Sequence, residues 1–251
     1  MLLLLPVLVP ILGGLWVFHV KTEQARQRVI LGILLATAVL TLVICLLPEQ
    51  AADLLTIQGE LRLALRSDLL AKFFMVLCCC IWAPVTFFAF PYIQHVGHER
   101  HFFTFYTMTL GVLMGLALAA NFVTMYMFFE MMSLATVPMV LHGATASARR
   151  AGFKYLGFSV FGAGMALAGY FFVAYYLAVP DFVAGGAIDV ERAAAHGPML
   201  LVVYCLMIVG FGAKAGMMPM QSWLPAAHPV APAPASAVLS GAITKGGVLA
   251  V

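Results

Sequence analysis

The sequence predicts an all-α fold, a polytopic membrane helix bundle of about eight transmembrane helices. Of its 251 residues, 64% are hydrophobic and only 9% are charged, which excludes a disordered chain and does not fit a soluble globular domain. The apolar residues are concentrated in runs of about 17–25 residues, the length of helix that crosses a bilayer core roughly 30 Å thick. The net charge of +3 is spread over the connecting loops, so we expect no nucleic-acid surface.

The predicted spans cover most of the chain. The first, MLLLLPVLVPILGGLWVF, has neither a basic leading region nor a clear cleavage site, so we interpret it as an uncleaved membrane helix and not as a signal peptide. A helix from Ala235 to Val251 would extend for roughly 24 Å, too short to cross the bilayer. We therefore expect the sequence to be a fragment, or else a partner subunit to continue the structure. The spans fall at approximately residues 2–18, 29–47, 69–90, 102–120, 122–142, 152–178 and 199–218, and an eighth begins near Pro234.

The distribution of charge among the loops predicts an orientation. Basic residues, counting histidine, exceed acidic residues in the loops after the first, third and fifth spans, whereas the loops after the second and sixth are mixed. By the positive-inside rule, the odd-numbered loops lie in the cytoplasm and the N-terminus lies outside. The second loop contains the alternating sequence LRLALR, which predicts a short strand or hairpin.

The stretch from Gly210 to Gly246 combines residues that an ordinary membrane span does not. Two lysines, Lys214 and Lys245, lie in apolar sequence near its ends, and five prolines lie between them. A lysine at the centre of a bilayer costs roughly 2.5–3.5 kcal/mol on insertion scales, so two lysines indicate a polar interior. Prolines this close together indicate helices that break where protein or water satisfies the freed backbone groups. We therefore predict a broken-helix, lysine-lined segment of an ion-conducting membrane protein.

Five ionisable residues in or beside the predicted spans are candidates for proton transfer. Burial disfavours the charged form of a lysine and a nearby carboxylate favours it, so the distance between the two groups would control whether the lysine holds its proton. A Glu–Lys–His–Lys series placed in this way would load, pass and release a proton. The candidates are Glu130 in the fifth span, Lys214 in the seventh, Lys245 in the eighth, His228 in the proline-rich break and Lys154 near the start of the sixth.

These candidates also have structural interpretations. Glu130 and Lys214 would form an ion pair that only fixes helix packing. His228 would be a hydrogen-bonded core histidine, and Lys154 would extend its side chain to the membrane interface.

No motif in the sequence indicates a metal, a cofactor or a catalytic centre. The five cysteines form no CxxC motif and no Cys/His cluster, so we expect them to be small buried apolar side chains and not disulfide, metal or iron–sulfur ligands. There is no Walker motif and no nucleophile elbow. We therefore predict that the chain binds no cofactor.

Three stretches resemble one known family. KAGMMPMQSWLPAAHPVAPAPASAVLSGAITKGG resembles the lysine–proline–WLP–AH–AP–SA–lysine signature of antiporter-like proton-translocating subunits. MYMFFEMMSLATVPM is similar to the helix-five glutamate motif of that family, and RRAGFKYLGFSVFGAGM resembles the start of its helix six. Such subunits occur in NADH:quinone oxidoreductase (respiratory complex I), in membrane-bound hydrogenases and in multisubunit sodium/proton antiporters.

The resemblance implies a role for each candidate. Glu130 would be the helix-five glutamate, and Lys214 would be its partner on a broken helix seven. Lys245 would be the helix-eight lysine that connects two half-channels, with His228 near it in the path. Lys154 matches a helix-six lysine less closely.

The resemblance also implies a domain organisation. In the family, the proton-translocating units are inverted five-helix repeats, helices four to eight and nine to thirteen. Residues 1–101 would hold the first three helices, and residues 102–251 would form the first repeat. The second repeat and its ionisable residue on helix twelve have no counterpart, so the sequence shows half of a pathway. Ala226 stands where the WLPDAH motif has its aspartate, and no role is carried over to it.

The sequence therefore favours a non-redox, proton-translocating membrane subunit of a complex I-like or hydrogenase-like assembly. One alternative is a subunit of a multisubunit cation (Na⁺)/proton antiporter that uses the same residues. Another is a truncated structural chain that only packs against partners. In each case we expect an integral, multi-pass protein of a bacterial or archaeal inner membrane, with other membrane subunits as its partners.

Overall fold

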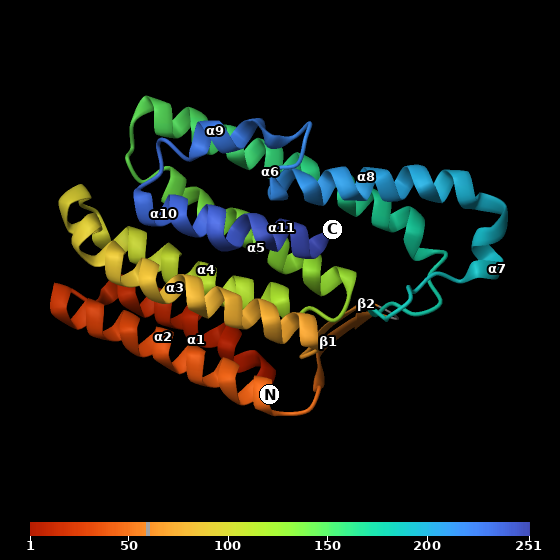
Figure 1. The fold of residues 1–251 in the computed structure, drawn as a ribbon, viewed down its shortest axis with the longest axis horizontal. Coiled ribbons are helices and arrows are strands. Elements are labelled where there is room, and N and C mark those ends of the chain that lie inside the picture. Colours follow the sequence, from red (N-terminus) through yellow and green to blue (C-terminus); the bar gives the residue numbers. More distant parts are fainter. Residues whose placement is uncertain (59–60) are drawn as a thin grey trace.

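The structure, a computed structural model that describes residues 1–58 and 61–251, is a bundle of long helices lying side by side (Figure 1). The long helices are α1 (Leu5–His19), α2 (Glu23–Leu46), α3 (Leu69–Val96), α4 (Glu99–Ala117), α5 (Phe122–Val140), α6 (Ala146–Ala174) and α8 (Gly197–Ala215). The strands β1 (Ala51–Gln58) and β2 (Leu61–Arg66) lie between α2 and α3. The shorter elements are η1 (Leu2–Leu4), α7 (Val190–Ala193), η2 (Ala194–His196), η3 (Gln221–Trp223), α9 (Leu224–Ala227), α10 (Ala233–Val238), the π-helical turn η4 (Leu239–Ile243) and α11 (Thr244–Ala250).

Six helices of the described chain are long and apolar enough to cross a membrane: Leu2–His19, Glu23–Leu46, Leu69–Val96, Phe122–Val140, Ala146–Ala174 and Val190–Ala215. The other two predicted spans are also helical, as α4 and as the run α10–η4–α11. α4 is less apolar because it is an inner helix, with 14 of its 19 residues buried against α1, α3 and α5. The last run contains a π-helical turn that was not predicted.

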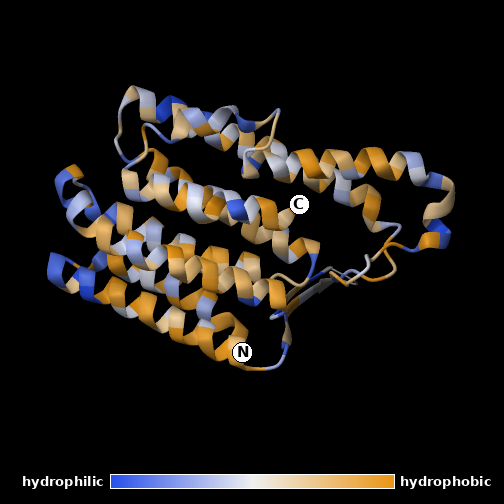
Figure 2. Cartoon of the chain, in the orientation of Figure 1, coloured by the Kyte–Doolittle hydropathy of each residue, from blue (hydrophilic) through white to orange (hydrophobic). Residues whose placement is uncertain are grey.

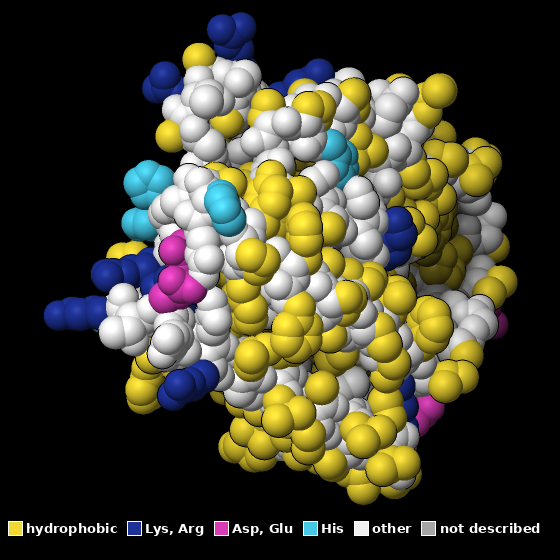
Figure 3. Space-filling model, turned by 60° about the vertical axis from the view of Figure 1, so that its left-hand side comes forward, with side chains coloured by type: hydrophobic (Ala, Val, Ile, Leu, Met, Phe, Trp, Pro, Cys, Tyr) yellow, Lys and Arg dark blue, Asp and Glu magenta, His cyan; other side chains and the backbone are white. Residues whose placement is uncertain are grey.

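The loops alternate between the two ends of the bundle. In Figure 1 the turns after α1, α3 and α5 lie at one end, and the hairpin and the α6–α7 connection lie at the other. Hydrophobic residues run along the helices and hydrophilic residues lie mainly at their ends (Figure 2). Figure 3 shows charged and histidine side chains gathered toward one end, with mostly hydrophobic side chains over the rest of the visible surface. The loops with excess basic residues therefore share one end, while the orientation of that end in the membrane stays a prediction.

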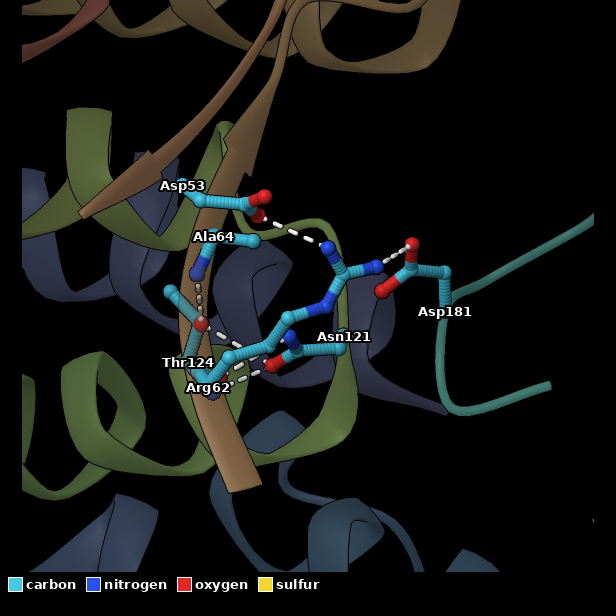
Figure 4. A network of polar contacts seen from close by, with 6 residues as sticks. All are labelled: Asp53, Arg62, Ala64, Asn121, Thr124 and Asp181. Carbon is cyan, nitrogen blue, oxygen red and sulfur yellow. Dashed lines mark hydrogen bonds and ion pairs between the residues drawn. The ribbon is translucent and has the colours of Figure 1, made fainter. Parts of the chain in front are cut away.

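The hairpin predicted from LRLALR is present and is bonded to two other segments (Figure 4). Arg62 on β2 forms ion pairs with Asp53 on β1 and with Asp181 in the loop after α6. Asn121, the N-cap of α5, donates a hydrogen bond to the Arg62 carbonyl at 3.0 Å and accepts one from the Thr124 amide at 2.9 Å. The hairpin thereby fixes the start of α5, the helix that carries the predicted glutamate.

The seventh predicted span is broken, as its prolines predicted. α8 ends at Ala215, and Gly216 caps it in a left-handed conformation (φ 77°) that favours glycine. The chain then turns through residues 217–220 into η3 and α9, and the indole of Trp223 donates a hydrogen bond to the Ala213 carbonyl at 2.7 Å. A carbonyl at the helix end is thus satisfied by protein, as the bilayer interior requires.

α6 and α8 approach each other closely because two glycines face one another. A Cβ atom on Gly162 would lie 2.5 Å from the Gly210 carbonyl oxygen, and a Cβ atom on Gly210 would lie 2.5 Å from the Gly162 carbonyl oxygen. Small residues at an interface let membrane helices pack backbone against backbone. This contact holds the last turns of α8 beside the inner face of α6.

The prediction that the cysteines are buried is wrong for two of them. Cys78 is buried, and Cys45 and Cys79 are partly buried, but Cys80 and Cys205 are exposed on the outer surfaces of α3 and α8. A thiol is apolar enough to face lipid as well as protein. The apolar sequence around each cysteine therefore could not predict whether it faces lipid or the protein interior.

His142 joins the turn after α5 to the turn between α3 and α4. Its Nε2 donates a hydrogen bond to the Gly97 carbonyl at 2.9 Å, and its ring contacts Phe102 edge-on. Burial lowers the pKa of His142. The positive charges of His98 and His101 lower it further, and the hydrogen bond to Gly97 opposes both effects.

Alanine at position 162 should destabilise the protein by about 1–3 kcal/mol, because the new methyl group would overlap the backbone of α8 and push the helices apart. Gly164 is the matched control, since no atom lies within 4 Å of its Cβ position. Gly164→Ala should be neutral or stabilising by up to about 1 kcal/mol. Thermal unfolding of Gly162→Ala and Gly164→Ala in detergent measures the difference, and equal melting temperatures would contradict the close contact.

Acidification should destabilise the fold partly through His142. Because the pKa of His142 is lowered in the folded protein, the unfolded chain binds the proton more readily. Its contribution to stability is therefore retained above the ordinary histidine pKa of about 6.5 and lost as the pH falls below that value. His142→Gln keeps an N–H donor for Gly97 but cannot titrate. Between about pH 7.5 and about pH 5.5 this variant should lose less stability than the parent protein, and equal losses would contradict the contribution of His142. Thermal melts at the two pH values make the comparison.

Candidate functional site

Lys214 is only 1% exposed, so its charged ammonium group is buried inside the helix bundle. Its Nζ donates hydrogen bonds to Ser133 Oγ at 2.8 Å, to the Tyr155 hydroxyl at 2.6 Å and to Ser159 Oγ at 3.1 Å. An ammonium group has three N–H donors, so all of them are satisfied. Nζ also lies 4.4 Å from the centre of the Tyr155 ring, where a cation is attracted to the aromatic face. We call these four residues the hydroxyl cluster.

Three helices bring the hydroxyl cluster together. Ser133 lies on α5, and the lysine lies in the last turn of α8. Tyr155 and Ser159 are four residues apart on α6, which places them on one face of that helix. The Tyr155 hydroxyl lies 2.5 Å from Thr136 Oγ1 on α5, and its ring centre lies 4.7 Å from that of Trp223. These contacts fix the tyrosine before it meets the lysine.

Glu130 lies on α5 three residues before Ser133, yet the described residues contain no ion pair between Glu130 and Lys214. The two side chains are close enough for their charges to interact, but the ammonium donates only to hydroxyls. Glu130 Oε1 is buried and accepts no hydrogen bond from a described residue. A buried polar atom in that state costs about 1–3 kcal/mol, more if it is charged. An ionisable group in this state inside a membrane bundle is a candidate functional residue.

A second polar cluster joins His228 and Lys245 through Ser240. His228 Nδ1 lies 2.6 Å from Ser236 Oγ, and its Nε2 lies 3.4 Å from Ser240 Oγ. Lys245 Nζ donates to the Ser240 carbonyl at 2.6 Å and, less closely, to Thr244 Oγ1 at 3.4 Å. Ser240 belongs to η4, and π-helical turns within α-helices often occur at functional sites. Unlike the first lysine, Lys245 is exposed.

α11 carries Lys245 of the second cluster and also packs beside the hydroxyl cluster. A Cβ atom on Gly247 would lie 2.4 Å from the Ala215 amide nitrogen, so α11 packs directly on the last turn of α8, beside Lys214. Lys245 is two residues earlier and faces away from this contact. Within the described part of the chain, no hydrogen bond joins the second cluster to the hydroxyl cluster.

Lys154 lies outside both clusters. It is exposed on the outer face of α6, while the next residue, Tyr155, faces the interior. The described residues give Lys154 no hydrogen-bond partner and no ion pair. The structure therefore does not bring Lys154 to Lys214, and its predicted place in the relay has no contact to support it.

A comparison with protein families decides the assignment. Residues 119–251 match the family described as NADH:quinone oxidoreductase/Mrp antiporter, transmembrane. The chain belongs to this family. The matched segment runs from the start of α5 to α11 and includes both polar clusters. Together with its apolar helices, membership makes the chain an integral, multi-pass membrane protein.

Individual relatives and a solved structure agree with the antiporter-like family. The chain is 27% identical over 257 residues to a Na(+)/H(+) antiporter subunit of Alkalihalophilus pseudofirmus, a match over 100% of this chain and 51% of the relative. It is 28% identical over 191 residues to hydrogenase-4 component B of Escherichia coli, over 75% of this chain and 28% of the relative. Its fold matches a chain of the membrane-bound sulfane sulfur reductase, an archaeal respiratory membrane complex, with a TM-score of 0.79 at 22% identity, over 100% of this chain and 40% of that chain. The chain thus spans about half, or less, of the length of the proteins it matches.

The hydroxyl residues of the cluster were not predicted from the sequence. Single serines and tyrosines in apolar helices are common and carry no charge that marks them as unusual. The available signal was spacing, because Ser133 follows Glu130 by three residues and Tyr155 and Ser159 are four apart. Such spacing places polar groups on one helix face, but it does not show which partner they face.

Loss of the Tyr155 hydroxyl should cost more stability when Lys214 is present than when it is absent. Tyr155→Phe removes one of three acceptors from a buried ammonium and should destabilise the protein by about 1.5–3 kcal/mol. In a Lys214→Met background the same change should cost less, and the double-mutant cycle should give a coupling of about 1 kcal/mol or more. Thermal unfolding of the four proteins measures it. Tyr106→Phe, at a buried tyrosine on α4 that bonds to Thr86, is the control and should cost the same in both backgrounds. Additive effects at Tyr155 would contradict the contact.

Proposed function

We propose that this chain forms one proton-translocating unit of an antiporter-like membrane subunit, in which Lys214 takes up and releases the proton. The observation that carries the proposal is a fully buried ammonium held by three neutral hydroxyl groups with no carboxylate in contact. A lysine that only fixed helix packing would be expected to have a direct counter-charge, because an uncompensated buried charge is costly.

Glu130 is the proposed control of that proton. Its carboxylate attracts the Lys214 ammonium through space without contacting it. Protonation of the carboxylate removes the attraction, so that the ammonium is held less strongly and its proton is released. No described residue donates a hydrogen bond to Glu130 Oε1, so this oxygen is available to accept the incoming proton that neutralises the carboxylate.

His228 and Lys245 are the proposed next positions of the proton. The two side chains share Ser240, and α11 packs against the end of α8 that carries Lys214. A proton released from Lys214 has to cross this packed contact to reach them, which makes the α8–α11 interface the proposed barrier. Lys154 is left out of the proposed path, because it lies on the outer face of α6.

The unit would work within a multisubunit assembly of the complex I-like or hydrogenase-like kind, with other membrane subunits as partners. A second candidate is a subunit of a multisubunit Na⁺/proton antiporter. It is favoured by one observation, that the antiporter relative aligns with 100% of this chain whereas the hydrogenase component aligns with 75%. The same residues would then exchange protons for sodium without electron transfer.

Removal of either proposed proton-carrying group should strongly reduce transport by the full-length protein in its assembly. Lys214→Met and Glu130→Gln should each reduce proton translocation by about tenfold or more, a barrier increase of at least about 1.4 kcal/mol. A pH-sensitive dye in inverted membrane vesicles reports the proton movement. The matched controls Lys21→Met, in the turn between α1 and α2, and Glu191→Gln, in the short helix α7, change the same residue types at exposed positions and should leave transport intact. Normal transport by an assembled Lys214→Met protein would overturn the proposal.

The same vesicles separate the two candidate functions. Proton movement that requires an electron donor such as NADH or hydrogen supports the redox-linked assembly. Collapse of an imposed pH gradient on addition of Na⁺, without an electron donor, supports the antiporter.

A further inference from the structure

The outer face of α6 contains an apolar pocket of about 400 Å³ with one charged side chain in its wall. Phe153 and Phe161 in this wall are 70% and 62% exposed, so the pocket opens outward from the bundle. One side of it is formed by the break after α8, next to α9, which packs along α6 (Figure 1). The pocket is lined by Phe153, Lys154, Gly157, Phe158, Phe161 and Met220.

The positive charge at this pocket has no acidic partner among the residues that the structure describes. The stretches 131–180 and 192–251, which supply α6 and everything from α8 onward, contain no aspartate and no glutamate. Neither Arg150 nor Lys154 forms an ion pair or hydrogen bond with another described residue. The two residues are four apart on one helix face, where like charges repel unless an anion lies between them. The described residues therefore supply no counter-charge for this pair, and both side chains are exposed to a ligand from outside.

The two basic residues lie in the first turns of α6, near the end of the bundle, where the headgroups of lipids are expected. α6 begins at Ala146, at the end of the bundle, so Arg150 and Lys154 lie roughly 6 and 12 Å along its axis. Phe158 and Phe161 lie deeper, where acyl chains are found. Basic side chains near the ends of membrane helices extend toward the headgroup region while their stems stay in apolar surroundings.

We propose that this pocket binds an anionic phospholipid, with its phosphate on Lys154 and Arg150 and an acyl chain against Phe158 and Phe161. Basic pockets at the ends of membrane helices attract anionic headgroups. The apolar wall gives a lipid a contact that a free phosphate ion lacks, and no acidic residue nearby competes for the lysine.

A lipid in this pocket would contact the supports of the hydroxyl cluster from outside. Lys154 directly precedes Tyr155, whose hydroxyl bonds to Lys214, and Met220 belongs to the break that ends α8. The lipid would thus hold α6 and the break together without entering the cluster.

Lipid retention in native mass spectrometry tests the proposal on the full-length protein. Purified in mild detergent, it should retain added phosphatidylglycerol in preference to phosphatidylcholine. The double variant Arg150→Gln/Lys154→Gln should retain about tenfold less phosphatidylglycerol. Arg149→Gln is the matched charge control, since Arg149 is exposed one residue away and off the face that Arg150 and Lys154 share. It should retain as much phosphatidylglycerol as the parent.

A photocrosslinker at Phe161 identifies the occupant in the membrane. Benzoylphenylalanine keeps the aromatic ring in place, and irradiation should attach a phospholipid mass to the chain. Crosslinking to another polypeptide would show that a protein covers the pocket and would overturn the proposal. Equal retention of the two lipids would also overturn it, as would equal loss of lipid in the double variant and in Arg149→Gln.

Discussion

Burial of the Lys214 ammonium is the constraint on which the arrangement of the surrounding helices depends. A charge removed from water has to be compensated by hydrogen bonds inside the protein. Here the acceptors come from α5 and α6, so both helices must reach the last turn of α8. The contact between Gly162 and Gly210 lets α6 approach that closely, and the hairpin bonded to Asn121 fixes where α5 begins. Contacts far from the lysine therefore help to hold its hydrogen-bond acceptors in place.

The break after α8 also helps to stabilise the buried charge of Lys214. The negative end of a helix dipole lies at the C-terminus, where a cation is stabilised. Ending α8 at Ala215 places this negative end beside Lys214 within the bundle. The Trp223 indole satisfies the Ala213 carbonyl, and Gly247 of α11 packs on the turn. The proline-rich sequence thus gives the lysine a polar helix end without exposing free carbonyls to lipid.

The sequence predicted what composition and periodicity control, and it could not predict which faces meet. Apolar runs located the helices, five prolines located the break, and charges in apolar sequence singled out Glu130 and Lys214. The direct partners of the lysine are hydroxyls on two other helices, and their selection depends on packing angles that no local pattern encodes. The same reason explains Lys154, which also lies in a predicted membrane span but on a helix face that points outward. A charged residue in an apolar run indicates an energetic cost of burial. Tertiary packing decides whether that residue faces the protein interior or the lipid.

Coordination by hydroxyls suits a lysine that has to lose its proton better than an ion pair does. A carboxylate in contact only accepts hydrogen bonds, so it stabilises the ammonium and offers nothing to the neutral amine. A hydroxyl group accepts from an ammonium N–H and, after rotation, donates to the lone pair of the amine. The Ser133, Tyr155 and Ser159 hydroxyls can therefore solvate both forms of Lys214 without moving their helices. The charge of Glu130, near but not in contact, is then free to shift the balance between the two forms. Direct pairing would fix the protonated form, so the proposed release of the proton depends on the absence of that contact.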